Sequence, residues 1–259
     1  MSMIVWWNGR LLAEDEVKIS PFDSCLLRGE GVFETILAVD GRIVSWPRHF
    51  KRLGNSADLL GITVPQEIAL VEAMRMVLDE NELAKGKARI RITLGDNELV
   101  TAVALPERGN TARIALVDLC RNEKSPLCHA KTCSYAENMV ALARAKEVGA
   151  DEAILANTKR ELCEGSLSNV FFVKEGKLCT PALDCGCLPG TVREALLEIA
   201  EVEEGHWPVE VLEEAEEIWL TSSTRPVTWV SHFGEREFGE PSEFFEETKG
   251  ELSRHIGGF

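Results

Sequence analysis

A hairpin signal followed at once by a helix signal constrains the fold of this chain more than any other feature. The runs Val32–Val39 and Arg42–Trp46 flank Asp40-Gly41, a dipeptide that favours the tight turn of a β-hairpin. Pro47 then stands in a predicted first helical turn, where its missing N–H costs little, and Gly61 is typical of a helix end. This region therefore predicts antiparallel strands followed by a helix.

The same signals occur elsewhere in the N-terminal half. Asn8-Gly9 suits a type I′ turn between Ile4–Trp7 and Leu11–Leu12, which predicts another hairpin. Pro65–Leu83 has the apolar spacing of an amphipathic helix. The residues expected on its apolar face are Ile68, Val71, Met74, Val77 and Leu78. Further strands are predicted at Ala88–Leu94, Thr101–Leu105 and Arg113–Leu119.

A polar stretch at residues 120–127 separates two patterns of elements, and it is the predicted interdomain linker. Beyond it, strands and helices alternate differently from those of the N-terminal half. The predicted helices there are Ala136–Gly149, Thr191–Val202 and Glu243–His255. We therefore predict an α+β or α/β protein of two domains, residues 1–119 and 128–259.

The composition is that of a globular protein that does not bind nucleic acid. At 259 residues, with 45% hydrophobic and 27% charged residues, the chain can form two domains. Its formal net charge of −15 argues against nucleic acid and anionic membrane surfaces as partners. No apolar run approaches the ~18 residues of a membrane span, and no signal peptide pattern is visible. We expect a cytoplasmic protein.

Eight cysteines are scattered along the chain, mostly inside apolar segments. A chain of this size does not need disulfides for stability. Cys185 and Cys187 have one residue between them, which is not the spacing of a zinc knuckle, and no histidine pair accompanies them. We expect reduced, buried thiols and no metal site.

Two residues of the C-terminal half suggest a specific chemistry. Lys131 precedes the first predicted helix after the linker, and Glu164 lies in a turn of small residues. A lysine can hold an aldehyde covalently, once desolvation or nearby cations lower the pKa of its amine. A carboxylate can keep a pyridine nitrogen protonated. Either residue alone would more often lie on the surface, but together they favour pyridoxal phosphate (PLP) as cofactor.

A PLP enzyme also needs a phosphate site. The N–H groups of Thr191 and Val192 open a predicted helix, and free N–H groups at a helix start bind anions. Ser223 and Thr224 follow an apolar strand and offer hydroxyls, while Arg52 offers a bidentate cation. Each pattern is weak alone, and their joint occurrence in this order supports PLP binding.

These residues lie in motifs that resemble the class IV aminotransferases, the fold-type IV PLP enzymes, over nearly the whole chain. The family includes branched-chain and D-amino-acid aminotransferases and 4-amino-4-deoxychorismate lyase. The matching motifs are Trp7-Asn8-Gly9, Ile19–Asp23, Arg28–Thr35, His49–Leu53, the segment from Lys131 to Ala153, Glu164–Phe171, Leu188–Arg193 and Thr221–Val230.

The resemblance implies two α/β domains with PLP between them and at least a homodimer. It makes Lys131 the Schiff-base lysine and Glu164 the partner of the pyridine nitrogen. It brings Tyr135, the only tyrosine, near the phenolic oxygen of the cofactor, although its spacing from the lysine differs by one residue. The phosphate ligands that it implies are Arg52, Thr191, Val192, Ser223 and Thr224.

The substrate is less well defined than the cofactor. Arg28 stands where the branched-chain enzymes have a tyrosine, and an unpaired arginine would not suit an apolar pocket. The loop Leu94–Leu99 lacks the Arg-x-His of the D-amino-acid enzymes, and Arg225 resembles the lyases more closely. The candidate substrate contacts are Arg28, Phe33 and Arg225.

Three functions are therefore considered. The first is an aminotransferase that moves an amino group from an amino acid to a 2-keto acid through Lys131. The second is a lyase that releases pyruvate from 4-amino-4-deoxychorismate, a dianion for which two arginines would have a use. The third is a non-catalytic relative, which the intact set of Lys131, Glu164 and Arg52 disfavours.

Overall fold

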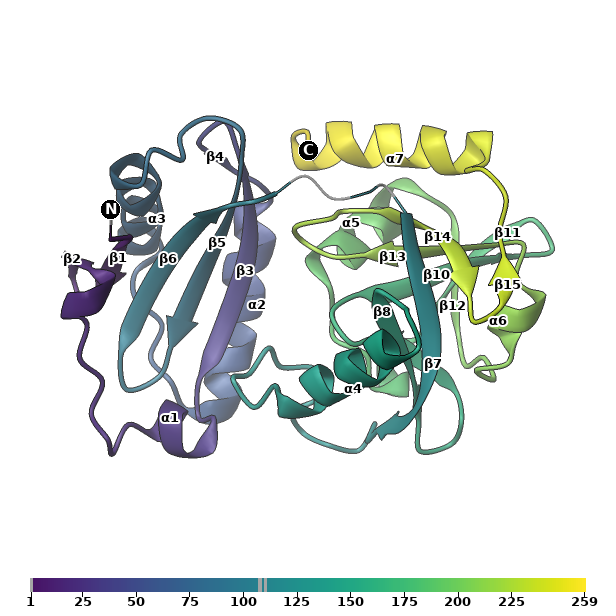
Figure 1. Ribbon diagram of the computed structural model, residues 1–259, viewed down its shortest axis with the longest axis horizontal. Helices are drawn as coiled ribbons and strands as arrows, with labels where there is room; N and C mark the ends of the chain where they lie inside the picture. The colour runs from purple at the N-terminus through teal and green to yellow at the C-terminus, as the bar shows by residue number, and fades with distance from the viewer. Residues whose placement is uncertain (1, 107–108, 110) are drawn as a thin grey trace. The chain divides into compact units, whose positions relative to one another are not determined.

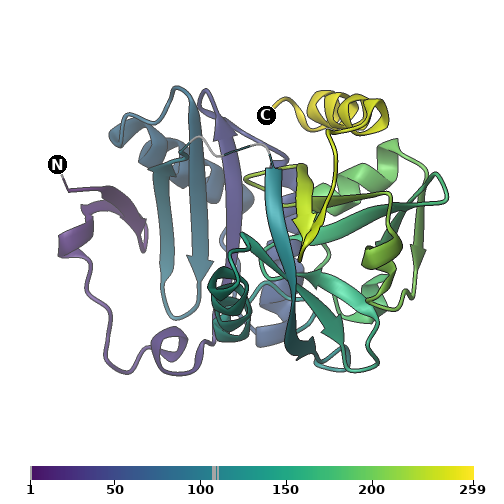
Figure 2. The ribbon, with the colours of Figure 1, turned by 45° about the vertical axis from the view of Figure 1, so that its right-hand side comes forward.

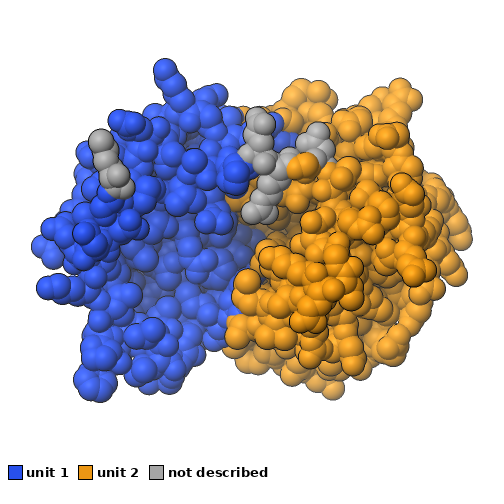
Figure 3. Space-filling model, viewed as in Figure 1, with its two compact units in different colours: residues 1–107, 130–135, 259 blue, residues 108–129, 136–258 orange. Residues whose placement is uncertain are grey.

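The computed structural model describes residues 2–106, 109 and 111–259. The chain forms two compact units, coloured separately in Figure 3. Unit 1 contains residues 1–107, 130–135 and 259, and unit 2 contains residues 108–129 and 136–258. The short segment 130–135, which carries Lys131, thus belongs with the N-terminal unit.

Unit 1 is built on an antiparallel sheet of six strands in the order β2-β1-β6-β5-β3-β4 (Figure 1). Both predicted hairpins are present, because Trp7 pairs with Arg10 and Val39 with Arg42. The strands are β1 Ile4–Trp7, β2 Arg10–Ala13, β3 Val32–Val39, β4 Arg42–Ile43, β5 Lys87–Leu94 and β6 Glu98–Ala104.

Two helices cover one face of this sheet, α2 (Trp46–Leu60) and α3 (Glu67–Glu80), both behind it in Figure 1. Their apolar sides pack with β3, β5 and β6 in one core that includes Leu53, Met74 and Ile90. The prediction that Ile68 lies on the buried face of α3 is wrong: its side chain is 66% exposed, because it lies in the first turn, and Leu70 is buried instead. Two short helices precede β3, η1 Glu14–Glu16 and α1 Ser24–Arg28.

Unit 2 is built on a mixed sheet of nine strands, with β15 paired only to β14. The path runs β12-β11-β10-β13-β14-β7-β8-β9, and β9 also contacts β10 and β11, so the sheet curls back on itself. The strands are β7 Thr111–Arg121, β8 Glu152–Asn157, β9 Leu162–Gly165, β10 Asn169–Lys174, β11 Lys177–Pro181, β12 Val202–Gly205, β13 Glu217–Thr221, β14 Thr228–Phe233 and β15 Arg236–Glu237.

The helices of unit 2 position its loops. Helix α4 (Ala136–Glu147) packs against β7 and β8, and α7 (Glu243–Ile256) packs against α5 (Thr191–Ile199) in Figures 1 and 2. The shorter helices are η2 Leu183–Cys185 and α6 Val211–Glu214. In the described part of the chain, no helix has the length and apolarity needed to cross a membrane.

The predicted domain boundary at residue 119 falls inside β7. That strand pairs in parallel with both β8 and β14, so its whole length belongs to the sheet of unit 2. The proposed linker at 120–127 therefore begins with the last two residues of a strand.

Candidate active site

Two hydrogen bonds hold the backbone of Lys131 within unit 1. Its N–H donates to Ser56 Oγ of α2 at 3.0 Å, and its carbonyl accepts from the N–H of Phe33 at 2.9 Å. The next residue, Thr132, forms an antiparallel bridge with Val32. The segment 130–135 thus lies along the first residues of β3, and this pairing sets the point from which the lysine side chain extends.

Aromatic rings surround the amine of Lys131. Its Nζ lies 4.4 Å from the ring centroid of Phe33 and 5.4 Å from that of Tyr135. The two rings meet edge to face, with centroids 5.2 Å apart. Arg91 Cζ lies 3.8 Å from the centroid of the same Phe33 ring. Three predicted site residues, Lys131, Phe33 and Tyr135, are therefore brought together, along with an arginine that was not predicted.

A buried ion pair lies beneath β3. Alternation along the strand turns Glu34 to the same side as Val32 and Ile36, which face the helices. Arg52 of α2 donates to both carboxylate oxygens of Glu34, from Nε at 2.8 Å and from Nη2 at 2.7 Å. His49, one turn earlier on α2, places Nδ1 2.7 Å from Glu34 Oε2. The predicted phosphate ligand Arg52 is thus held in a defined orientation.

The charge states of this cluster follow from its burial. Burial alone would raise the pKa of Glu34, but the charge and hydrogen bonds of Arg52, assisted by His49, lower it to about 2. Burial lowers the pKa of His49, and the attraction of Glu34 only partly opposes it. The cluster is therefore an ionised Glu34–Arg52 pair with a neutral imidazole at neutral pH.

In unit 2, Glu164 lies at the C-terminal part of β9 and is buried. Its Oε2 accepts from the backbone N–H of Leu188 at 2.9 Å, and its Oε1 accepts from Arg121 Nη2 at 3.0 Å. Arg121 of β7 also pairs with Glu137 of α4 at 2.5 Å. The carboxylate is therefore neither a turn acid facing solvent nor an isolated charge.

A buried hydroxyl lies at the N-terminus of α5, next to the amides of the first helical turn. Thr191 begins the helix and is 3% exposed, and its Oγ1 has no hydrogen-bond partner among the residues that the structure describes. The amides of Thr191 and Val192 belong to the first turn, whose N–H groups have no acceptor within the helix. A buried hydroxyl beside such amides fits an anion.

Gly190 and Asn169 fix the loop before α5. Asn169 Nδ2 donates to the carbonyl of Leu188 at 2.8 Å. A Cβ on Gly190 would stand 1.9 Å from Asn169 Oδ1, so only glycine fits there. Asn169, the first residue of β10, also pairs with Thr221, the last residue of β13. The turn that follows β13 therefore begins beside Asn169.

That turn holds the other predicted hydroxyls and one predicted arginine. The amide and hydroxyl of Ser222 both donate to the carbonyl of Arg225, at 3.2 and 3.3 Å, and this closes a turn over Ser223 and Thr224. Arg225 Nη2 donates to the carbonyls of Gly109 and Thr111 at 2.9 and 3.2 Å. The structure thus places Ser223 and Thr224 in a defined turn of unit 2.

Arg28 differs from the other predicted site residues. Its side chain is 59% exposed and makes two hydrogen bonds to Glu30, from Nε at 2.6 Å and Nη2 at 2.8 Å. Phe33 and Arg225, the other candidate substrate contacts, belong to unit 1 and unit 2 respectively.

Four residues near these groups were not predicted as site residues. Glu34 could have been noticed as a carboxylate inside the apolar run of β3, and His49 by its helical spacing from Arg52. Glu152 is buried and accepts hydrogen bonds from Ser166 and from Ser168 Oγ, which hold the turn after Glu164. Burial raises the pKa of Glu152 against the effect of these bonds. No sequence signal marks Arg91.

Comparisons with known proteins show the family to which the chain is related. The family model described as amino-transferase class IV matches residues 31–233. A Thermotoga maritima protein named "Probable branched-chain-amino-acid aminotransferase" is 31% identical over 92% of this chain and 90% of its own length. The aminodeoxychorismate lyase of Bacillus subtilis is 28% identical over 92% of this chain and 89% of its own length.

A solved structure shows the same fold. The crystal structure of a branched-chain aminotransferase from Thermoproteus uzoniensis with norvaline superposes with a TM-score of 0.91. It is 26% identical, and the match covers 99% of this chain and 96% of the other.

Proposed function

The chain belongs to the class IV aminotransferase family, and from this membership we propose that it transfers an amino group from an amino acid to a 2-keto acid with PLP as cofactor. The observation that carries the proposal is the placement of Lys131, whose backbone is pinned to β3 and α2 and whose amine lies against two aromatic rings. Such a lysine is positioned as a nucleophile rather than as a surface charge.

The residues of each unit fit the cofactor of this family. Class IV aminotransferases are PLP enzymes, and bound PLP supplies an aldehyde that a lysine can hold and a ring that accepts electrons from the substrate Cα. The unsatisfied hydroxyl of Thr191, beside first-turn amides, fits a phosphate group. The phosphate ligands that we propose are Arg52, Thr191, Val192, Ser223 and Thr224.

The protein side chains then have separate tasks. Lys131 Nζ holds the cofactor and afterwards moves the proton at the substrate Cα. Glu164 keeps a proton on the pyridine nitrogen, and its bonds to Arg121 and Leu188 fix its orientation. Tyr135, which packs on Phe33, is proposed to reach the phenolic oxygen. Rigid side chains of this kind lower a barrier by positioning and by fixed electrostatics.

A lyase is the second candidate, and the similarity to the Bacillus subtilis aminodeoxychorismate lyase favours it. Its reaction releases pyruvate from 4-amino-4-deoxychorismate and needs no amino acceptor. Arg28 and Arg225, with Phe33, are the proposed substrate contacts in either case. The two candidates differ in one measurable respect, since only the aminotransferase converts the cofactor to its amine form with an amino donor.

We also propose that the protein works as a cytoplasmic homodimer. Helix α1 and the residues before it expose several large apolar side chains close together in the sequence, and grouped apolar side chains on a surface often mark a protein–protein contact. These side chains are Phe22 (83% exposed), Leu26 (64%) and Leu27 (56%). Mass measurement in solution tests the dimer, and a monomer at working concentration would contradict it.

The decisive experiment combines a spectrum with a covalent label. PLP added to the purified protein should give a visible absorption band, and borohydride should then fix the cofactor on the peptide that contains Lys131. Lys131→Ala should lose both signals, whereas Lys159→Ala, at a residue whose side chain is 54% exposed, should keep both. Labelling of another lysine, or full turnover by Lys131→Ala, would refute the assignment.

A panel of L- and D-amino acids then separates the candidate functions. Conversion of the band by one donor supports the aminotransferase and names its substrate. A band that no donor converts, with pyruvate formed from 4-amino-4-deoxychorismate, supports the lyase. A bound cofactor without either reaction would point to the non-catalytic relative.

A further inference from the structure

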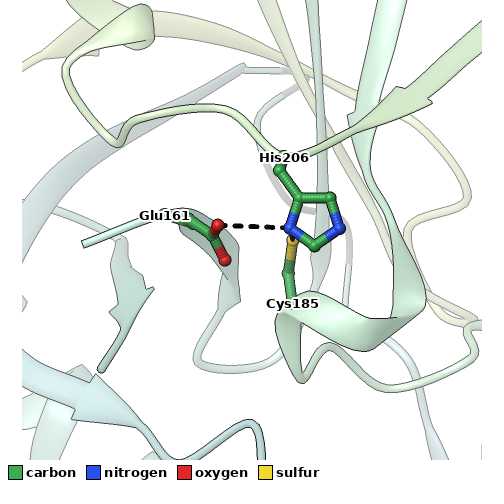
Figure 4. A group of neighbouring side chains, drawn as sticks. All are labelled: Glu161, Cys185 and His206. Carbon is green, nitrogen blue, oxygen red and sulfur yellow. Dashed lines mark hydrogen bonds and ion pairs between the residues drawn. The ribbon is translucent and has the colours of Figure 1, made fainter. Parts of the chain in front are cut away.

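Three side chains of unit 2, none of them among the proposed cofactor or substrate residues, converge at one point (Figure 4). Glu161 precedes β9, Cys185 ends η2, and His206 follows β12. One carboxylate oxygen, the thiol sulfur and one ring nitrogen all lie within 4.8 Å of one another. These groups are O, S and N donors, and three different segments of the chain supply them.

Two of the three separations between these donors match those of ligands around one tetrahedral metal ion. His206 Nδ1 lies 3.6 Å from Cys185 Sγ and 3.2 Å from Glu161 Oε1. Zinc binds sulfur at about 2.3 Å and nitrogen or oxygen at about 2.0 Å, so tetrahedral angles require S–N and N–O separations of about 3.5 and 3.3 Å. His206 Nδ1 therefore already stands at a ligand separation from both other donors, and the sulfur of Cys185 and the carboxylate oxygen of Glu161 lie within 4.8 Å of each other.

Two of these three residues have hydrogen-bonding neighbours of the kind that orient metal ligands in known sites. His206 Nε2, the ring nitrogen away from the sulfur, lies 3.1 Å from Asp184 Oδ1. Asn157, which is 1% exposed, donates from Nδ2 to the other oxygen of Glu161 at 2.6 Å. A carboxylate on the second nitrogen of a ligating histidine fixes its tautomer and orientation. Outer partners thus hold both His206 and Glu161.

An ion-pair network would explain only part of this arrangement. Asp184, His206 and Glu161 could form a charged chain across the surface, as many groups do without a metal. That network does not include Cys185, whose buried sulfur lies 3.8 Å from the carbonyl oxygen of Gly205 and 3.6 Å from the ring nitrogen that Glu161 also faces. A thiolate, an imidazole and a carboxylate together select zinc over magnesium or calcium.

We propose that Glu161, Cys185 and His206 bind a zinc ion. Binding releases the thiol proton to solvent, and the thiolate and carboxylate together balance the charge of the dication. The side chain of His206 is 43% exposed, so water can reach the site and supply a fourth ligand. The site ties η2 to β9 and β12, and η2 leads into Leu188, whose N–H holds Glu164.

Spacing rules could not find this site in the sequence. Cys185 and His206 are 21 residues apart, and no paired cysteines or histidines mark them. The expectation of no metal site was based on Cys185-Gly186-Cys187, and Cys187 does not take part: its Sγ lies near the carbonyls of Pro181 and Ala182.

Cobalt titration of the reduced, metal-stripped, full-length protein at about pH 8, where an ordinary imidazole is neutral, tests the proposal directly. We expect one equivalent to bind, with the visible bands of tetrahedral cobalt and a sulfur-to-cobalt charge-transfer band. Zinc should displace the cobalt and raise the unfolding temperature by on the order of 5 °C at a hundredfold excess over its Kd. Asp184→Asn should weaken zinc binding about 10–100-fold.

Matched variants make the result specific. Cys185→Ser should lose the charge-transfer band, and His206→Gln, at a partly exposed residue that can be replaced without unfolding, should lose stoichiometric binding. Cys179→Ser removes another buried thiol, and His255→Gln removes a histidine whose Nε2 lies 2.9 Å from Glu198, and both should bind cobalt normally. Cobalt binding without a sulfur band would overturn the proposal. So would cobalt binding by Cys185→Ser and His206→Gln that is as tight as binding by the natural protein.

Discussion

Arg52 donates two hydrogen bonds to Glu34, of 2.8 and 2.7 Å, inside unit 1, where both side chains are almost fully buried. One end of the guanidinium is thereby turned toward the sheet, and the side chain cannot rotate freely. The pair links β3, which is bonded to the Lys131 segment, to α2, whose Ser56 also holds Lys131. A single ion pair thus connects the orientation of Arg52 with the position of the lysine.

Glu34→Gln should destabilise the protein strongly, because it leaves the charge of Arg52 buried without a counter-ion. Loss of one partner of a buried pair costs about 3 kcal/mol, which urea denaturation can measure. Glu30→Gln is the matched control, since Arg28 and Glu30 have the same two-bond geometry on the surface. We expect a far smaller change there. Equal losses in the two variants would contradict the role of burial.

The same cluster predicts sensitivity to acid. The pKa of Glu34 is lowered from 4.5 to about 2, so its contribution is complete above pH 4.5 and is lost as pH falls toward 2. That shift corresponds to about 3 kcal/mol. The pKa of His49 is lowered from 6.5, so a further contribution is lost as pH falls below 6.5. The titrations of Glu34 and His49 therefore both lower the stability of the protein as pH falls.

Unfolding free energies measured across this range separate the two groups. His49→Gln should remove the loss of stability that begins below pH 6.5 and keep the loss below 4.5. Parallel curves for the variant and the natural protein between these two values would show that His49 does not titrate as its burial requires.

Local signals predicted much of the fold. The Asn-Gly and Asp-Gly dipeptides predicted the two hairpins. In the structure Asn8 and Asp40 adopt the positive φ that such turns require. Helix α2 begins at Trp46 and ends before Gly61, within one residue of the prediction. The fold-type IV class with mixed helices and sheets is confirmed by the match to the solved structure. The prediction for Ile68 was wrong because the 3.6-residue period gives the face of a helix but does not show which helical turns extend beyond the core.

The candidate site was only partly predictable. Lys131 and Glu164 stand in motifs that can be read along the chain, and their assigned roles stay predictions. The partners that orient them come from distant positions: Ser56 contacts Lys131, and Arg121 contacts Glu164. Arg91 reaches Phe33 because β3 and β5 pair in register, Phe33 with Thr93 and Thr35 with Arg91. Strand register follows from tertiary packing, and no local pattern encodes it.

Gly190→Ala should weaken PLP binding, because the new Cβ would stand 1.9 Å from Asn169 Oδ1 and push the loop away from the start of α5. We expect a rise of the PLP dissociation constant on the order of tenfold, which corresponds to ~1.4 kcal/mol, in a spectroscopic titration. Gly54→Ala, in the middle of α2 with open space around it, should leave PLP binding unchanged. It should also stabilise the helix by about 0.5–1 kcal/mol. Unchanged binding by Gly190→Ala would remove this loop from the phosphate site.

Two buried threonines differ in one respect that tests the phosphate assignment. Thr191 Oγ1 has no partner among the described residues, whereas Thr180 Oγ1 donates to the carbonyl of Val170 at 2.8 Å. Thr191→Val should therefore keep or raise the stability of the cofactor-free protein and weaken PLP binding, because it removes a hydroxyl that only a ligand would satisfy.

Thr180→Val should show the opposite behaviour. Removal of its hydroxyl leaves the carbonyl of Val170 without this donor, which costs about 1 kcal/mol of stability, and PLP binding should be unaffected. Thermal unfolding without cofactor and PLP titration, carried out on both variants, give the comparison. A large loss of stability in Thr191→Val with unchanged PLP affinity would mean that this hydroxyl has a structural role and that the phosphate binds elsewhere.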